Sequence, residues 1–448
     1  MFFYNLGLEK YLGLALYLSF VAAFLLSVFW RPMIGLYYLV PLIPLQTIRY
    51  RMSRFPLGEA VVGIVLSGVA LGLLRRRKWI FPKTPWTALL GVYAVFLLAS
   101  VFLDSSNIGP RLMEWKDYMM MPLLFFVVAS AVETPRQMRL LLVLMCASAF
   151  MMDRSFWNAI KDRDFSSFSR DLQEGGAMGY SGVQGMAAFN AQYAWMLLAL
   201  AGSRQKRLVR WALLALAGFA ANCVMYSLSR GGYVAFIAGW LFVGAVRYRS
   251  LLVLAALFGL TWTAVVPNAV RERVMMTYDP NLAAQKSEAQ ADGELDHSAE
   301  LRLELWADAL DLFKSNPILG TGFNTYAYMK RVGNYADTHN IYVKVLIETG
   351  VVGLALFLCL LLKTYRAGYR LFRTSRSPFF AALGLGLAAW VVANGVCNLF
   401  GDRWTYLQVN GYMWTLAGLV ARAAELESTA PETGETAAVP GGEFAPAI

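Results

Sequence analysis

Residues 339–358 read HNIYVKVLIETGVVGLALFL and form the border between a polar segment and an apolar one. The apolar run begins at Ile341 and continues to about residue 362, so it is long enough to cross the core of a bilayer as a helix. Apolar runs of about 18 residues or more recur along the rest of the chain. The pattern predicts an all-α fold, a polytopic bundle of transmembrane helices.

The composition of the 448-residue chain supports this prediction. Hydrophobic residues make up 58% of the chain and charged residues 15%, too few to cover the surface of a soluble protein of this length. All four cysteines fall in apolar runs, which disfavours a disulfide framework or a thiolate metal site. The two histidines, His297 and His339, are too few for a multi-histidine metal site. We expect neither a metal nor another cofactor.

The formal net charge of +11 is concentrated in clusters between the apolar runs. The clusters are RRRK at 75–78, RQKRLVR at 204–210, RYR at 247–249 and five basic residues between 363 and 376. Cytoplasmic loops of membrane proteins carry such an excess of Lys and Arg. The charge therefore indicates topology and an attraction to anionic membrane lipids, and we expect no nucleic acid partner.

About 12 spans are predicted, with approximate boundaries. From residue 57 onward they are 57–74, 84–103, 118–132, 140–152, 178–202, 211–228, 231–246, 251–266, 341–362, 378–399 and 405–421. With the basic clusters inside, the connections 104–117, 153–177, 229–230, 267–340 and 400–404 lie outside the cytoplasm. The predicted regions are N-terminal transmembrane helices (1–266), an extracytoplasmic loop (267–340), C-terminal transmembrane helices (341–421) and a disordered cytoplasmic tail (422–448).

The N-terminal part leaves two options open. One span fits at about 11–30, and a second at 33–48 is short and carries two prolines. If both cross, Arg49, Arg51 and Arg54 lie outside the cytoplasm, against the positive-inside trend. Either the count is wrong by one or these arginines are held outside for a purpose, so the chain has 12 or 13 helices.

The connection 267–340 is too long to be a simple linker. Its second half contains an amphipathic helix, because Leu303, Trp306, Leu310 and Phe313 recur at spacings of three and four. The helix stops at SNPILGTGFN, where a proline and two glycines break regular structure.

Ionisable residues at an apolar border are functional candidates, since burying them is costly. His339 directly precedes an apolar run and can accept a proton from a hydroxyl, although a structural loop histidine is the alternative. Asn340 is expected to cap the following helix and is also a candidate for substrate binding. Glu348 lies further inside the run, so we expect it to pair with a cation or to face a wet cavity.

Two arginines are candidates for binding an anion. Arg230 lies between two apolar runs with almost no loop, and Gly231 and Gly232 are expected to permit the tight turn and the close approach of a ligand. Its planar guanidinium matches phosphate oxygens, although interfacial snorkelling is the alternative. Arg302 borders the apolar stripe of the loop helix and, taken alone, fits an ordinary exposed arginine.

Three blocks in this order resemble the O-antigen ligase and O-antigen polymerase superfamily. They are SRGGYVAFIAGW (229–240), RLELWADALDLFKSNPILGTGFNTY (302–326) and HNIYVKVLIETGVVGLALFL (339–358), and the resemblance extends from about residue 180 to 420. It implies a metal-independent glycosyltransferase in the bacterial inner membrane. Such an enzyme moves a glycan from a polyprenyl (undecaprenyl) diphosphate carrier to an acceptor hydroxyl on the periplasmic side. The paired arginines and the histidine of the family correspond here to Arg230, Arg302 and His339.

The resemblance suggests a mechanism for these residues. Arg230 and Arg302 hold the diphosphate and stabilise the charge that grows on it, while His339 is the general base. Direct displacement at the anomeric carbon inverts its configuration. Arg49, Arg51 and Arg54, if extracytoplasmic, form a second group of positive charges that attracts the anionic lipid.

Several functions remain open at this point, including the transfer of the glycan to protein by a third branch of the superfamily. The first choice is an O-antigen ligase, whose acceptor is the glycolipid formed by the lipid A core. The second is an O-antigen polymerase that joins carrier-linked repeat units. A transporter of a lipid-linked anionic substrate is the alternative from another class, although the internal repeats typical of transporters are not visible in the sequence.

Overall fold

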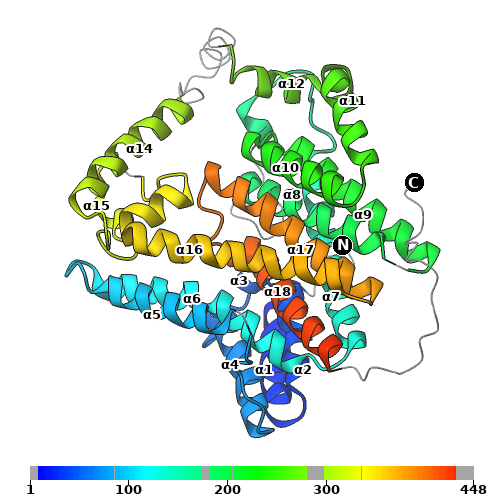
Figure 1. The fold of residues 1–448 in the computed structure, drawn as a ribbon, viewed down its shortest axis with the longest axis vertical. Helices are drawn as coiled ribbons and strands as arrows, with labels where there is room; N and C mark the ends of the chain where they lie inside the picture. Colours follow the sequence, from blue (N-terminus) through cyan, green and yellow to red (C-terminus); the bar gives the residue numbers. More distant parts are fainter. Residues whose placement is uncertain are drawn as a thin grey trace.

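The computed structural model describes residues 9–84, 86–173, 182–203, 205–279, 297–333 and 335–429. All regular secondary structure within these ranges is helical, which confirms the predicted fold class (Figure 1). The α-helices are α1 (Glu9–Phe29), α2 (Pro32–Leu42), α3 (Gln46–Tyr50), α4 (Val61–Arg75), α5 (Thr87–Val101), α6 (Ile108–Ala131), α7 (Pro135–Ile160), α8 (Gly182–Ala201), α9 (Arg207–Tyr226), α10 (Arg230–Val246), α11 (Ser250–Val265), α12 (Asn268–Met275), α14 (His297–Ser315), α15 (Tyr326–Met329), α16 (Ile341–Thr374), α17 (Pro378–Cys397) and α18 (Leu407–Ser428). Three short 3-10 helices are η1 (Gly58–Ala60), η2 (Arg170–Gln173) and η3 (Asn398–Phe400).

Six of the described helices are long and apolar enough to cross a membrane, and they lie in α1, η1–α4, α7, α9, α16 and α17–η3. A seventh span is possible if α11 and α12, which meet at an angle of 109°, count as one. Helices α2, α5 and α10 are apolar but shorter. These helices support a membrane protein, while the predicted number of about 12 spans stays a prediction.

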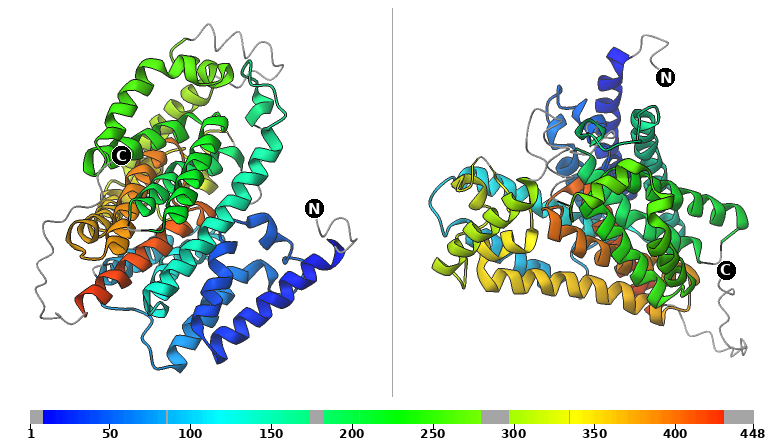
Figure 2. Two further views of the ribbon diagram at one scale, coloured as in Figure 1. Left: turned by 90° about the vertical axis from the view of Figure 1, so that its right-hand side faces the viewer. Right: turned by 90° about the horizontal axis from the view of Figure 1, so that it is seen from above.

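Helix α16 crosses the middle of the molecule (Figure 1). It packs along α17 and also contacts α5 and α14, while α8 lies against α9, α10 and α17. The N-terminal helices α1, α2 and α4 pack against one another, and α2 and α4 also contact α7 and α6 (Figure 2). The loop helices α14 and α15 contact α16. Helix α10 packs on α8 and α17, and α11 packs on α10.

Several predicted boundaries differ from the structure because the helices extend beyond their apolar runs. Helix α6 begins at Ile108 instead of about residue 118, and α7 spans Pro135–Ile160 instead of about 140–152. Helix α16 continues to Thr374 instead of about residue 362, since Thr364, Gly368 and Leu371 remain buried. Helix α18 reaches Ser428, so the predicted tail does not begin at 422. Residues 430–448, which carry the rest of the predicted disordered tail, lie outside the described residues.

Two of the basic clusters contact the ends of neighbouring helices. Arg76 donates a hydrogen bond to the carbonyl of Trp30, and Lys78 pairs with Glu133. Near the C-terminal end of α18, Glu427 accepts hydrogen bonds from the hydroxyl of Ser375 (3.0 Å) and from a neighbouring backbone N–H. The segment 49–54 precedes α4 and the cluster 75–78 follows it, so the two basic segments lie at opposite ends of this helix.

Candidate active site

A cavity of about 1680 Å³ brings together three residues that are far apart in the sequence. Arg230, Arg302 and His339 all line it. The cavity is bounded by α8, α9, α10, α11 and α12 and by the segments that carry Arg302 and His339. The structure therefore places the three predicted residues around one space.

Arg230 is the first residue of α10, and its position is fixed by a helix cap. The side chain of Ser229 accepts a hydrogen bond from the backbone N–H of Gly232 (3.3 Å). The Arg230 guanidinium donates a hydrogen bond to the hydroxyl of Thr277 (3.0 Å). Because the N-terminus of a helix carries partial positive charge, it favours an anion at the same place as the guanidinium does.

The expected tight turn at the two glycines after Arg230 is corrected, whereas the close approach of a ligand stays a prediction, since both glycines line the cavity. The tight turn is made by Leu228, whose φ of 54° lies in the left-handed region, and not by the glycines. Gly231 and Gly232 lie in the first turn of α10, where an added Cβ would come within 2.9 Å of Phe400 and 2.8 Å of Ala187. They allow α10 to pack closely on its neighbours.

Arg302 lies on α14, whose buried face differs from the predicted stripe. Leu305 and Ala309 are fully buried, whereas Leu303 is 65% exposed and Leu310 is 48% exposed. The expected stripe was out of phase because two leucines on the outer face also fit its spacing. Arg302 lies one turn before Leu305, so it shares the buried side of the helix.

Burial defines the electrostatics of Arg302. Its Nε atom is buried without a hydrogen-bond partner in the described structure. Burial lowers the pKa of Arg302, and the positive charges of Arg230 and Arg403 lower it further. An anion in the cavity would relieve both effects.

His339 is held by a local arrangement that involves Asp337. Its backbone N–H donates to Oδ1 of Asp337 (2.8 Å), and its φ of 52° is uncommon for a residue with a side chain. The Nδ1 atom lies 3.6 Å from Oδ2 of Asp337, within electrostatic reach but beyond hydrogen-bond distance. Trp306 of α14 donates to the carbonyl of Thr338 (2.9 Å), so the loop before α16 is attached to the helix that carries Arg302.

Asp337 is negatively charged at neutral pH. Burial raises its pKa, but the nearby His339, whose backbone N–H donates to the carboxylate, and the positive charge of Lys344 outweigh burial, so the pKa lies below the ordinary value of an aspartate. A carboxylate beside Nδ1 favours a proton on that nitrogen and leaves Nε2 as the acceptor. Sequence reasoning did not single out Asp337, although an acid two positions before a candidate base is a signal that could have found it.

Asn340 acts as a helix cap. Its Oδ1 accepts from the backbone N–H groups of Tyr342 (3.0 Å) and Val343 (3.3 Å), as expected for an N-cap residue. It is not among the residues that line the cavity. The cap starts α16 directly after His339 and so helps to position the candidate base.

Glu348 is bound differently from what we expected. In the described part of the chain, its carboxylate accepts the backbone N–H groups of Asn324 (3.0 Å) and Tyr326 (3.3 Å). The nearest lysine of α16, Lys344, forms an ion pair with Asp402 (3.2 Å) instead. Glu348 therefore holds the loop that follows α14. It forms no ion pair within 4 Å among the described residues, and Lys344 is the cation that acts on it at longer range.

Two further arginines, Arg273 on α12 and Arg403 after η3, line the same cavity. None of the described lining residues is an aspartate or a glutamate. The backbone of Arg403 is fixed on both sides, because its N–H donates to Oδ1 of Asn398 (2.9 Å) and its carbonyl accepts from Asn410 (2.8 Å). Both arginines lie in predicted connections next to apolar runs, but the sequence gives no signal that links them to this site.

Arg49, Arg51 and Arg54 are not among the residues that line the cavity. The guanidinium of Arg49 donates to the carbonyl of Ile43 (3.0 Å), within its own segment. The prediction that these three arginines surround the site is therefore not supported by the lining of the cavity.

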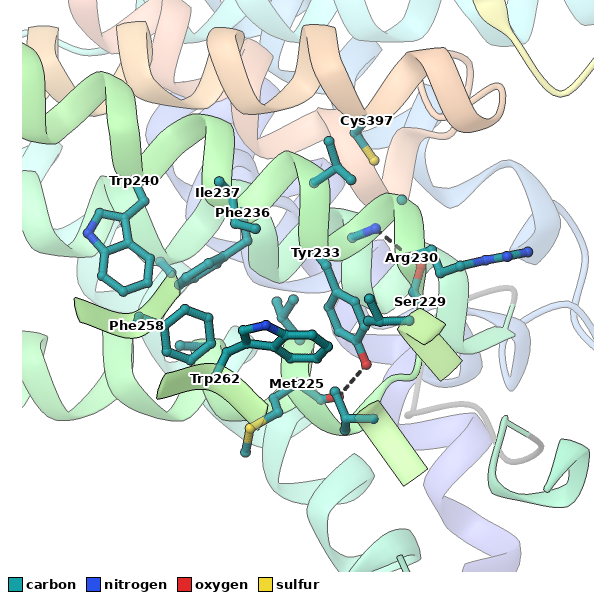
Figure 3. A pocket seen from close by; sticks show the side chains of 18 of the residues that line it. Met225, Ser229, Arg230, Tyr233, Phe236, Ile237, Trp240, Phe258, Trp262 and Cys397 are labelled. Atoms are coloured by element: carbon teal, nitrogen blue, oxygen red, sulfur yellow. Dashed lines mark hydrogen bonds between the residues drawn. The ribbon is translucent and has the colours of Figure 1, made fainter. Parts of the chain in front are cut away.

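The rest of the cavity is apolar. Figure 3 shows Trp240, Phe258 and Trp262 along one part of it and Arg230 at the other end. The ring of Tyr233 forms part of the cavity wall, and its hydroxyl donates a hydrogen bond to the carbonyl of Met225 (2.8 Å). The space therefore has a cationic end and a long apolar part.

Residues 212–358 match a family described as O-Antigen ligase. This segment belongs to the O-antigen ligase/polymerase superfamily. It covers about a third of the chain, from α9 to the middle of α16, and contains Arg230, Arg302 and His339. The resemblance predicted from the sequence is confirmed. No curated protein matches the chain.

Proposed function

We propose that the protein is a membrane glycosyltransferase of the O-antigen ligase/polymerase type. It takes a glycan from a polyprenyl (undecaprenyl) diphosphate carrier and joins it to an acceptor hydroxyl at the periplasmic face of the bacterial inner membrane. The observation that carries the proposal is the cavity that is lined by Arg230, Arg302 and His339 and continues into an apolar part.

The shape and lining of the cavity suit such a donor. Pockets for small ligands have volumes of about 300–1,000 Å³, and this cavity is larger, at about 1680 Å³. Its aromatic and aliphatic walls suit a prenyl chain, and its arginines suit a diphosphate. A lipid-linked glycan has both parts in one molecule.

The chemistry needs charge stabilisation and one proton acceptor. The bond between the anomeric carbon and the diphosphate oxygen breaks, and the acceptor oxygen forms a new bond to the same carbon from the opposite side. Arg230 and Arg302 stabilise the negative charge on the departing diphosphate, in a site where shielding from water strengthens each contact. The Nε2 atom of His339 takes the proton of the acceptor hydroxyl. The product has an inverted anomeric configuration.

A variant at His339 tests the base. Asparagine tolerates a left-handed backbone, so His339→Asn keeps the local conformation and removes the proton acceptor. We expect glycan transfer by the purified variant to fall by about 10²–10⁴-fold, with the affinity for a prenyl diphosphate unchanged. Turnover at the wild-type rate and neutral pH would remove His339 from the mechanism.

The acceptor distinguishes the two enzymes of the superfamily. We place the ligase first, with the lipid A core as acceptor, and the polymerase second. Purified protein that receives only carrier-linked repeat units should leave them unchanged if it is a ligase. It should join them into longer chains if it is a polymerase. Movement of a lipid-linked substrate across vesicles without any covalent product would identify a transporter instead.

A further inference from the structure

Arg273 has no role in the mechanism described so far. It lies on α12, which follows α11 after a sharp bend at Pro267. The bend of 109° turns the chain across the end of α10 and places Arg273 on the cavity wall. The side chain of Arg273 is only 8% exposed.

The surroundings of Arg273 leave part of its guanidinium without a partner. The Nε atom donates a long hydrogen bond to the carbonyl of Leu228 (3.4 Å), and the guanidinium carbon lies 4.9 Å from the centre of the Phe168 ring. The NH1 atom is buried and has no hydrogen-bond partner in the described structure. Burial and the positive charge of Arg230 lower the pKa of Arg273 to about 10, so the side chain is still a cation at neutral pH.

A purely structural role does not account for this arrangement. Holding the turn at Leu228 needs one donor, whereas a guanidinium has five N–H groups. A buried cation without an anionic partner is costly, and uncharged side chains could hold the same carbonyl at lower cost. Gln173, for example, already donates to the carbonyl of Leu228 (2.8 Å).

The position of Arg273 along the cavity indicates which part of a ligand it faces. It belongs to the α11–α12 side, where Trp262 and Val266 line the apolar part. Arg302 and His339 line the cavity from other segments, α14 and the loop before α16. Val270 and Val274, which flank Arg273 on α12, also line the cavity, and Arg273 lies within electrostatic reach of Arg230 and Arg302. Arg273 therefore borders apolar lining on its own helix and has the arginines of the cationic end as neighbours.

We propose that Arg273 binds the phosphate that is attached to the prenyl chain, while Arg230 and Arg302 hold the sugar-bearing phosphate. The inference rests on the proposed function. It adds that different arginines bind the two phosphates of the diphosphate. Arg273 then contacts the donor through a group that does not take part in the bond that breaks. The bend between α11 and α12 places Arg273 on the cavity wall.

Binding of short prenyl compounds to the purified full-length protein tests the proposal. The probes are farnesyl diphosphate, farnesyl monophosphate and farnesol, which share one chain and differ in the number of phosphates. Charge-assisted hydrogen bonds are the strong ones, so we expect Arg273→Gln to weaken binding of both phosphate compounds by about 10-fold or more. Binding of farnesol should not change.

Matched variants separate the ligand role from a structural one. Arg271→Gln removes the same charge from the same helix at a residue outside the cavity lining, and it should bind all three probes as the wild type does. Arg273→Lys keeps the charge but not the geometry at Leu228 and Phe168, so it should retain most of the monophosphate affinity. The lysine variant also keeps the test valid if the glutamine variant fails to fold.

The outcomes distinguish this inference from the proposed function. Wild-type affinity of Arg273→Gln for farnesyl monophosphate overturns the inference and leaves the function intact. Equal losses in the glutamine and lysine variants, or a parallel loss of farnesol binding, also overturn it, because they indicate a structural role. A wild-type protein that binds farnesyl diphosphate no better than farnesol contradicts the proposed function itself.

Discussion

Asp337 determines how the imidazole of His339 is presented. Its carboxylate accepts the backbone N–H of His339 at 2.8 Å and lies 3.6 Å from Nδ1. The first contact holds a left-handed backbone in place, and the second stabilises the positive charge that His339 gains when it takes a proton. The base of the proposed reaction is thus His339 together with the carboxylate of Asp337.

Asp337→Asn should separate these two contributions. Asparagine keeps an oxygen for the backbone N–H but loses the charge beside Nδ1. We expect kcat to fall by roughly 10- to 100-fold, a part of the 10²–10⁴ that general base catalysis contributes. The KM for the lipid donor should change little, since Asp337 does not line the cavity. Steady-state kinetics with purified protein measure both quantities.

A control for this variant is Asp311→Asn, which removes an exposed acid of α14 that pairs with Lys314 (2.6 Å). It should leave kcat unchanged. An Asp337→Asn enzyme that keeps its kcat but loses donor affinity would contradict the assigned role and point to a defect in the fold of the loop.

The sequence predicts some residues of this site and not others, for a physical reason. His339 and Arg230 stand at borders between polar and apolar segments, where an ionisable group needs an explanation. Arg273 and Arg403 stand at similar borders but became candidates only when folding brought them to one cavity. Side-chain proximity between distant positions depends on helix packing, which one sequence does not reveal.

Among the elements, the turn after α14 and the break in α16 form one unit. Gly350 interrupts α16 with a φ of 64°, and the turn at Gly320 has a φ of 72°. Their backbones are joined by hydrogen bonds from Thr321 to the carbonyl of Ile347 (3.0 Å) and from Val351 to that of Pro317 (2.9 Å). The turn therefore fills the break in the long helix and fixes α14 on α16.

The sequence anticipates half of this unit. Gly320 and Gly322 stand out after a helical pattern as residues that end a helix. Gly350 lies inside an apolar run, where a glycine costs little and attracts no attention. Its left-handed backbone follows from contact with the turn and could not be read from the local pattern.

Gly350→Ala should disrupt this unit. A Cβ at Gly350 would collide with the carbonyl of Ile318, and the backbone conformation is unfavourable for alanine. We expect the free energy of unfolding to fall by about 1–3 kcal/mol, and glycan transfer to fall because α14 carries Arg302. Thermal unfolding in detergent and a transfer assay measure the two effects.

Gly91→Ala is the matched control for this change. Gly91 lies inside α5, and nothing lies within 4 Å of an added Cβ. The substitution should leave stability equal or slightly higher, since alanine is the better helix former. Equal stability of the Gly350→Ala variant and the wild type would show that the break in α16 tolerates a side chain.

At the scale of the whole molecule, positive charge has two locations with different causes. The clusters around Arg76 and Lys78, and the basic residues at the end of α16, follow the expected cytoplasmic excess. Arg230 lies between α9 and α10, at the ends of these helices that are opposite to the clusters 204–210 and 247–249, where the predicted topology expects few cations. The proposed anionic donor would account for an arginine at this place.

At this scale the all-helical class was predicted correctly, while the number of spans stays a prediction. Periodic apolar runs identify helices reliably because burial in lipid or protein requires them. They do not give the lengths of α16 and α18, which extend beyond the apolar runs through contacts with other helices. The short N-terminal helix α2, with Pro41 inside it, shows the limit of span counting by length alone.

The orientation of the N-terminal helices can be tested by labelling single cysteines in spheroplasts, in a background without the four native cysteines. Helix α4 separates Glu59, at its start, from Lys83, beyond its end, and both residues are exposed. If the cavity opens to the periplasm, Glu59→Cys should react with a membrane-impermeant maleimide and Lys83→Cys only after permeabilisation. Asp162→Cys, in the exposed segment between α7 and η2, is the periplasmic reference. Labelling of Lys83→Cys without permeabilisation would reverse the assignment, and it would place the basic cluster 75–78 outside against the charge rule.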